Sequence, residues 1–225
     1  MSAPYLNKDG EDRSVVPLEA LRRLMKERKQ ARTDVEHCEL CSELIPADHQ
    51  HLLDISSLTV KCACQACSLL FNDKGAGGGK YRLISKRYLA LLDFWMSDEQ
   101  WDEMTIPVNM VYIFQSTHGN RIMAFYPSPA GAIESLLDLE NWTTLISNNP
   151  ILNTIEPDVE ALLINRVRGA HEYFIVPIDA CYKLVGLIRV RWKGLGGGEE
   201  VWKEIEAFFA DIQQKSEAVR GEPNA

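Results

Sequence analysis

Two cysteine pairs with the same spacing decide the fold of the first third of this chain: Cys38-Glu39-Leu40-Cys41 and, after 22 intervening residues, Cys64-Gln65-Ala66-Cys67. The two-residue spacer lets both thiolates of a pair point at one ion, and two such pairs build a tetrahedral sulfur site. Four thiolates suit zinc or iron and exclude magnesium and calcium, which prefer oxygen ligands. The pattern predicts a metal-binding region over residues 34–73, with Cys38, Cys41, Cys64 and Cys67 as ligands.

Further ligand types surround the two pairs. Cys62 lies two residues before Cys64, on the same face if that segment is a strand, so it could replace Cys64 or stand as a spare thiol. His37, His49 and His51 are substitute or additional ligands, or donors of a hydrogen bond to a sulfur. For each histidine, an exposed or locally bonded side chain is the simpler alternative. Five clustered cysteines also leave an iron–sulfur cluster open.

The residues beside the pairs bear on the choice of metal. A rubredoxin, which holds one iron, usually has glycine after each pair and proline inside the second. Here Ser42 and Ser68 occupy the glycine positions and Gln65 occupies the proline position. These departures favour zinc over iron or an iron–sulfur cluster. A closed four-thiolate site has no open coordination position, so its role is structural or redox rather than hydrolytic.

The rest of the chain predicts an α+β protein in which a small zinc-ribbon or rubredoxin-like module is attached to a body with a mainly antiparallel sheet and helices. The expected divisions are a tail and basic amphipathic helix at 1–33, the cysteine region at 34–73, the body at 80–218 and a frayed tail at 219–225. Glycine-rich Lys74–Gly79 is expected to be a flexible connector. Strands are predicted at His51–Ile55, Leu58–Cys62, Tyr81–Ile84, Val108–Ser116, Arg121–Tyr126, Ala161–Val167 and Tyr173–Ile178.

Helices are predicted from capping and periodicity signals. They are Pro17–Ala31, a short helix after the capping box that begins at Ser97, a helix from an Asp138 cap to Ser147, one from an Asp179 cap to Trp192, and Glu199–Glu217. A hairpin turn is expected at His118-Gly119-Asn120, and Pro127–Gly131 is expected to end the second strand of that hairpin in a turn.

The charge balance restricts the class of partner. The chain of 225 residues has a formal net charge of −8, while residues 1–33 carry eight Lys/Arg and five Asp/Glu. The acidic remainder argues against broad binding to nucleic acid, which needs an excess of basic side chains. No apolar run reaches the ~18–20 residues of a membrane span. The polar N-terminal stretch does not resemble a signal peptide, so a cytoplasmic protein is expected.

Signals for catalysis are few. The sequence has no Gly-x-Ser-x-Gly elbow and no His-Glu-x-x-His motif. Cys181, in the first turn of a predicted helix, is a candidate reactive thiol because a helix start can lower a thiol pKa. The alternative is a small, buried, apolar side chain. A non-enzymatic protein is therefore the stronger expectation.

Several motifs in this order resemble an uncharacterised bacterial family of unknown function. They are Cys-Glu-Leu-Cys, His-x-His-Leu at 49–52, Cys-Ala-Cys-Gln-Ala-Cys, Ala-Phe-Tyr-Pro-Ser-Pro-Ala-Gly at 124–131, Glu-Pro-Asp-Val-Glu-Ala-Leu-Leu at 156–163 and Pro-Ile-Asp-Ala-Cys-Tyr at 177–182. Genes of that family tend to lie beside those of uptake [NiFe]-hydrogenases. The resemblance implies a protein partner, either a [NiFe]-hydrogenase subunit or a maturation factor.

Three hypotheses follow. The first is a non-enzymatic accessory or assembly protein for a [NiFe]-hydrogenase with a four-cysteine zinc site. The second is a rubredoxin-like iron protein that passes electrons for the hydrogenase. The third is a zinc-ribbon regulator that binds nucleic acid through its basic helix, which the acidic body disfavours.

Overall fold

The computed structural model describes residues 36–104, 106–135, 139–194 and 196–220. The predicted helix at Pro17–Ala31 and the Asp138 cap lie outside these residues. The elements occur in this order: β1 (Glu36–His37), β2 (Leu44–Ile45), β3 (Gln50–Asp54), β4 (Thr59–Ala63), α2 (Gln65–Asn72), α3 (Lys74–Gly77), β5 (Tyr81–Leu83), β6 (Leu89–Leu91), α4 (Asp98–Glu103), β7 (Met110–Ser116), β8 (Arg121–Ser128), β9 (Gly131–Ser135), α5 (Leu139–Asn148), η1 (Pro150–Thr154), β10 (Glu160–Asn165), η2 (Val167–Gly169), β11 (Glu172–Pro177), α6 (Ile178–Arg191), α7 (Glu199–Lys215) and β12 (Glu217–Val219).

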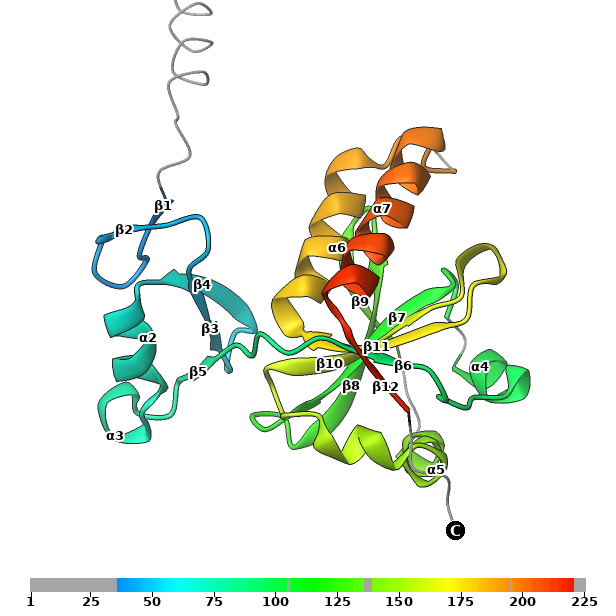
Figure 1. Ribbon diagram of the computed structural model, residues 1–225, viewed down its shortest axis with the longest axis horizontal. Coiled ribbons are helices and arrows are strands. Elements are labelled where there is room, and N and C mark those ends of the chain that lie inside the picture. Colours follow the sequence, from blue (N-terminus) through cyan, green and yellow to red (C-terminus); the bar gives the residue numbers. More distant parts are fainter. Residues whose placement is uncertain (1–35, 105, 136–138, 195, 221–225) are drawn as a thin grey trace, which may run out of the picture.

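We call β1 to β5, with α2 and α3, the cysteine module, and the remaining elements the body; the module lies to one side of the body (Figure 1). Its main sheet has the strand order β4-β3-β5, and β1 pairs with β2 in a separate ribbon. The antiparallel hairpin of β3 and β4 confirms the two strands predicted on either side of Ser56-Ser57.

The strand predicted to open the body belongs instead to the module. β5 pairs antiparallel with β3, with Leu53 opposite Arg82. Between the hairpin and β5, the chain forms α2 and α3, so most of Lys74–Gly79 is helical where a flexible connector was expected. The Asp73 side chain caps α3 by accepting hydrogen bonds from the N–H groups of Gly75 and Ala76.

Asp54 fixes the turn between β3 and β4. One carboxylate oxygen accepts hydrogen bonds from the Ser56 hydroxyl at 2.7 Å and from the Ser56 N–H at 3.1 Å. The Ser56 hydroxyl, assisted by the Ser56 and Ser57 N–H groups and by Lys80, outweighs the effect of burial and lowers the pKa of Asp54 to about 2. The carboxylate is therefore favoured in the folded protein.

Replacement of Asp54 by asparagine should remove a pH-dependent part of the stability. The pKa is lower in the folded chain than in the unfolded chain, so the carboxylate stabilises the fold above about pH 4, and this contribution is lost as the pH falls towards 2. Between pH 5 and pH 2, the wild-type free energy of unfolding should fall by about 2 kcal/mol more than that of Asp54→Asn. Urea denaturation at both pH values measures this difference, and equal pH slopes for the two proteins would contradict it.

The body is built on a seven-stranded sheet with the order β12-β6-β11-β10-β7-β8-β9. Every neighbouring pair is antiparallel except β12 with β6, which confirms the mainly antiparallel sheet. β12 contains Val219, which was expected to begin a frayed tail. The residues of the sheet alternate between its two faces, as strands require.

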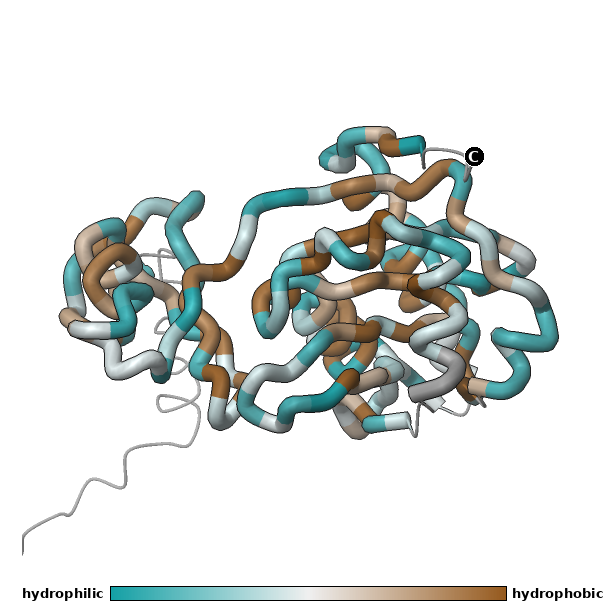
Figure 2. The backbone as a smooth tube through the Cα atoms, turned by 90° about the horizontal axis from the view of Figure 1, so that it is seen from below, coloured by the Kyte–Doolittle hydropathy of each residue, from teal (hydrophilic) through white to brown (hydrophobic). Residues whose placement is uncertain are grey.

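The two faces of the sheet carry separate hydrophobic cores. The first core joins side chains such as Tyr112 and Phe174 to those of α6 and α7, and the second joins Ile113 and Ile175 to α4, α5 and η1. Helices therefore cover both faces (Figure 1), and hydrophobic segments gather along the central strands (Figure 2). Leu53 of β3 belongs to the first core, so the module and the body share apolar packing.

Other predicted elements are confirmed or corrected as follows. The hairpin of β7 and β8, the pairing of β10 with β11, and the Ser97–Gln100 capping box are present. β8 continues through Ser128 and turns into β9, so the turn expected over Pro127–Gly131 is confined to its end. Asp179 was expected to cap α6, but the helix already begins at Ile178 and Asp179 lies in its first turn.

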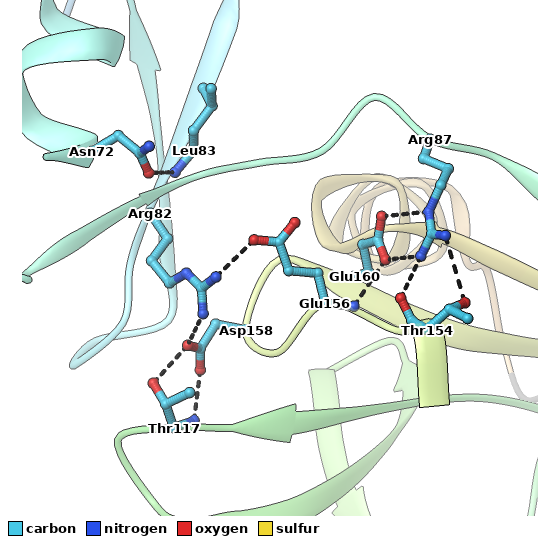
Figure 3. A network of polar contacts seen from close by, with 9 residues as sticks. All are labelled: Asn72, Arg82, Leu83, Arg87, Thr117, Thr154, Glu156, Asp158 and Glu160. Carbon is cyan, nitrogen blue, oxygen red and sulfur yellow. Dashed lines mark hydrogen bonds and ion pairs between the residues drawn. The ribbon is translucent and has the colours of Figure 1, made fainter. Parts of the chain in front are cut away.

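Polar contacts between the module and the body centre on two arginines (Figure 3). Arg82 of β5 reaches Glu156 at 2.7 Å and the completely buried Asp158 at 3.3 Å. Arg87, in the segment that leads from β5 to the body, donates from Nε to Glu160 at 2.9 Å. Burial raises the pKa of Glu160, but the Arg87 guanidinium and the Glu156 N–H outweigh it and lower that pKa.

Within the described ranges of the chain, we find no helix with the length and apolar character needed to cross a membrane.

Candidate metal centre

The structure brings the two predicted cysteine pairs together. Cys38 and Cys41 lie in the turn between β1 and β2, and Cys64 and Cys67 lie at the start of α2; the four sulfur atoms are all within 4.8 Å of one another. The Cys41 and Cys64 sulfurs are 3.7 Å apart. Two thiolates bound to one zinc ion at about 2.3 Å and a tetrahedral angle lie about 3.8 Å apart. The spacing suits one ion, whereas a multi-iron cluster places its cysteines on different irons and therefore farther apart.

The first pair is held by a closed backbone turn. The N–H of Cys38 donates to the Glu43 carbonyl and the N–H of Ser42 donates to the Cys38 carbonyl, both at 2.8 Å. Ser42 closes the turn at a φ of 65°, in the left-handed region that glycine usually occupies. The glycine position of a rubredoxin-type turn therefore has its usual backbone conformation here, although serine occupies it.

Glu39 fastens this turn to the main sheet of the module. Its carboxylate accepts hydrogen bonds from the Lys61 ammonium at 2.8 Å and from the Cys62 N–H at 3.0 Å. Its own N–H donates to the Cys62 carbonyl at 2.9 Å. These contacts hold the turn of the first cysteine pair against the end of β4, and the second pair begins at the residue that follows β4.

The second pair is positioned by a helix start. Cys64 is the residue that caps α2, and the N–H of Cys67 donates to its sulfur at 3.4 Å. The first N–H groups of a helix have no partner within the helix, and here one of them is used to hold the Cys64 sulfur. The second pair therefore opens a helix and does not lie in a second hairpin turn, and the expected ribbon or rubredoxin-like arrangement is not confirmed.

The four thiols differ in their surroundings. Cys38 and Cys67 are buried, whereas Cys41 is exposed. Burial raises the pKa of Cys38, but N–H groups of Cys64, Leu40 and Cys41 donate to its sulfur and lower the pKa to about 6. Burial raises the pKa of Cys67 above its usual range. A bound cation would displace the remaining thiol protons, because metals bind the thiolate form.

Cys62 and two of the histidines form a separate group. The nitrogen and sulfur ligand atoms of His49, His51 and Cys62 lie within 4.8 Å of one another, apart from the four-sulfur set. His37 belongs to neither group of described residues, and its Nδ1 lies 3.1 Å from the Ser42 carbonyl oxygen. This arrangement favours Cys64 over Cys62 as the fourth member of the sulfur site.

Cys181 has the surroundings of a core residue. It is completely buried on α6, where burial and the nearby charge of Asp179 raise its pKa well above the ordinary thiol value. A reactive thiol needs access and a lowered pKa. The burial and the raised pKa of Cys181 favour its alternative role as a buried, apolar core residue. Asp179 itself, expected only as a cap, forms a 2.6 Å contact with His51 of the module.

The fold and the site together describe an α+β protein with a candidate four-cysteine metal centre. The chain belongs to a family of unknown function, DUF5947, whose model matches residues 37–216. The match includes both cysteine pairs and confirms the resemblance to an uncharacterised family. Neither the search of curated proteins nor that of solved structures found a match. The association with a hydrogenase stays a prediction.

Proposed function

We propose that this protein is a non-enzymatic accessory or assembly factor for a [NiFe]-hydrogenase, in which one zinc ion in the four-cysteine site holds the module in shape for contact with a partner. The observation that carries the proposal is the closed set of four sulfurs, all within 4.8 Å of one another. Four protein ligands leave a tetrahedral ion no open position for a substrate, which favours a structural role. The hydrogenase is suggested by the family resemblance described from the sequence.

The surface of the module supports contact with a partner. Leu44, Leu69 and Leu70 are each more than half exposed, and the last two lie on the helix that begins with the second cysteine pair. Leu69 and Leu70 are adjacent in the chain, and exposed apolar side chains that lie together are typical of protein interaction surfaces. An electron-transfer role for an iron-loaded site is the second candidate, because exposed Cys41 would bring a metal-bound sulfur to the surface.

Metal analysis of protein purified from its native host tests the first part of the proposal. We expect zinc without visible absorption bands, and a loss of zinc in the Cys38→Ser variant. His37→Gln, which changes an exposed side chain outside both ligand groups, should keep its zinc. Iron with strong visible bands would instead establish the electron-transfer candidate.

Hydrogenase activity in a host that lacks this gene tests the second part. We expect activity to fall to background and to return with wild-type protein or with His37→Gln, but not with Cys38→Ser. Full hydrogenase activity in the deletion strain would overturn the accessory role and leave the metal assignment untouched.

A further inference from the structure

The second ligand group is built by the register of the β3–β4 hairpin. His51 lies directly opposite Cys62 in the antiparallel pair. His49 precedes β3 and lies two residues before His51, so both imidazoles are on the same face. The ligand atoms of the three residues lie within 4.8 Å of one another. The hairpin thus places two imidazoles and one thiol around a common point.

The partners of the imidazole Nδ1 atoms determine which nitrogens carry protons. The Nδ1 of His51 lies 2.6 Å from a carboxylate oxygen of Asp179. The Nδ1 of His49 lies 2.8 Å from the Pro46 carbonyl oxygen and 3.2 Å from a carboxylate oxygen of Glu36. Carbonyl and carboxylate oxygens only accept hydrogen bonds, so both Nδ1 atoms are donors. In the neutral rings, both Nε2 atoms therefore present lone pairs.

The two Nε2 atoms lie close together. The Nε2 atoms of His49 and His51 are 3.1 Å apart, and the His49 side chain is only 6% exposed. Because both Nδ1 atoms donate elsewhere, a hydrogen bond between the Nε2 atoms needs an additional proton on one ring, and a metal ion can take the place of that proton. Two imidazoles bound to one zinc ion at about 2.05 Å and a tetrahedral angle lie about 3.3 Å apart, which is close to the observed distance. A proton shared by the two imidazoles needs no third group, whereas a metal ion does, and Cys62 supplies a thiol as a third ligand.

We propose that His49 Nε2, His51 Nε2 and Cys62 Sγ form a second metal site for a divalent ion of the zinc class. Two imidazoles and a thiolate are donors that suit zinc, cobalt and nickel rather than magnesium or calcium. Asp179 and the Pro46 carbonyl act as positioning groups, since the outer hydrogen bond of a metal-bound histidine fixes its tautomer and orientation. This site does not depend on the proposed accessory function.

The second site differs from the four-cysteine site in coordination. Three protein ligands leave one position of a tetrahedral ion for water or for an atom of an incoming ligand. His49 and His51 line a cleft of about 400 Å³ between the module and the body, together with Lys86, Tyr88 and Asp179. The four-cysteine site has no free coordination position. The second site has one free coordination position, which faces this cleft and can exchange water for another ligand.

A zinc titration of the metal-free full-length chain tests the proposal, with reducing agent, without oxygen, and with a chromophoric chelator as competitor. We expect wild-type protein to bind two Zn²⁺ per chain. Cys62→Ser and His49→Ala should each bind one. Asp179→Asn should keep both but bind one of them about 10–100-fold more weakly, because it loses only a positioning group. His37→Ala is the matched histidine control and should bind two.

Co²⁺ provides an independent readout of the ligands. The cobalt absorption added by the second equivalent should include a thiolate charge-transfer band, and this band should be absent in Cys62→Ser. Two results would overturn the second site: wild-type protein that binds only one equivalent of metal, or a second equivalent whose binding is unchanged in both Cys62→Ser and His49→Ala. In either case, a shared proton would be the cation between the imidazoles. Cys62→Ser should retain the ion of the four-cysteine site, because Cys62 lies outside the four-sulfur set, which separates the failure of one site from that of the other.

Discussion

Replacement of Cys38 by serine should unfold the cysteine module while the body keeps its fold. The core of the module is small, and two of its five buried residues, Cys38 and Cys67, are themselves members of the sulfur site. A structural zinc site contributes about 10 kcal/mol or more to the folding of such a small unit. Without the ion, the remaining apolar packing is insufficient to keep the module folded, and nothing holds the two cysteine pairs together.

Hydrogen exchange followed by mass spectrometry measures this effect. We expect Cys38→Ser, and wild-type protein stripped of metal, to lose protection over residues 36–83, while the central strands β7, β10 and β11 stay protected. His37→Gln is the control, because it changes an exposed side chain of the module outside both ligand groups. If the module of Cys38→Ser were as well protected as that of His37→Gln, the four-cysteine site would not hold the module together.

Replacement of Asp158 by alanine should cost about 3 kcal/mol of unfolding free energy. The carboxylate is completely buried and accepts hydrogen bonds from the Thr117 N–H at 2.7 Å and from the Thr117 hydroxyl at 2.6 Å. It also pairs with Arg82 of the module. Its loss removes these hydrogen bonds of a buried carboxylate and a link between module and body. Alanine adds strain because residue 158 has a φ of 68°.

Urea denaturation of two further variants separates these contributions. Asp158→Asn tolerates the left-handed backbone and keeps an acceptor, so it should be less destabilising than alanine. Glu134→Ala removes one partner of the exposed pair with Arg121 and should cost less than about 1 kcal/mol. If Asp158→Ala were no more destabilising than Glu134→Ala, the buried carboxylate would have no special role in stability.

Local signals in the sequence predicted much of this fold. The β3–β4 hairpin follows from two β-rich runs around Ser56-Ser57, and α4 follows from the Ser97 capping box. The two cysteine pairs predicted the sulfur cluster because their spacing encodes how each pair surrounds an ion. In each of these cases, the signal lies in residues within a few positions of one another, although the two cysteine pairs are themselves separated by 22 residues.

Features that depend on distant partners were not predicted. α2 is capped by Cys64, a residue type outside the usual N-cap set, and no local signal marked this helix. β5 joins the module through pairing with β3, which its own sequence does not reveal. The role of Asp179 was missed for the same reason, because its partner His51 is 128 residues away. Its proximity to a predicted helix start suggested only a cap.

The same separation of 128 residues delays the positioning carboxylate of the second ligand group during translation, whereas the ligands of both groups lie within residues 38–67. All four cysteines of the sulfur cluster have been synthesised long before Asp179 is added. At about 5–20 residues per second, the ribosome needs on the order of ten seconds to reach Asp179 after His51. A nascent chain can therefore close its four-cysteine site on the ribosome, whereas the carboxylate that orients His51 arrives only with the last helices of the body.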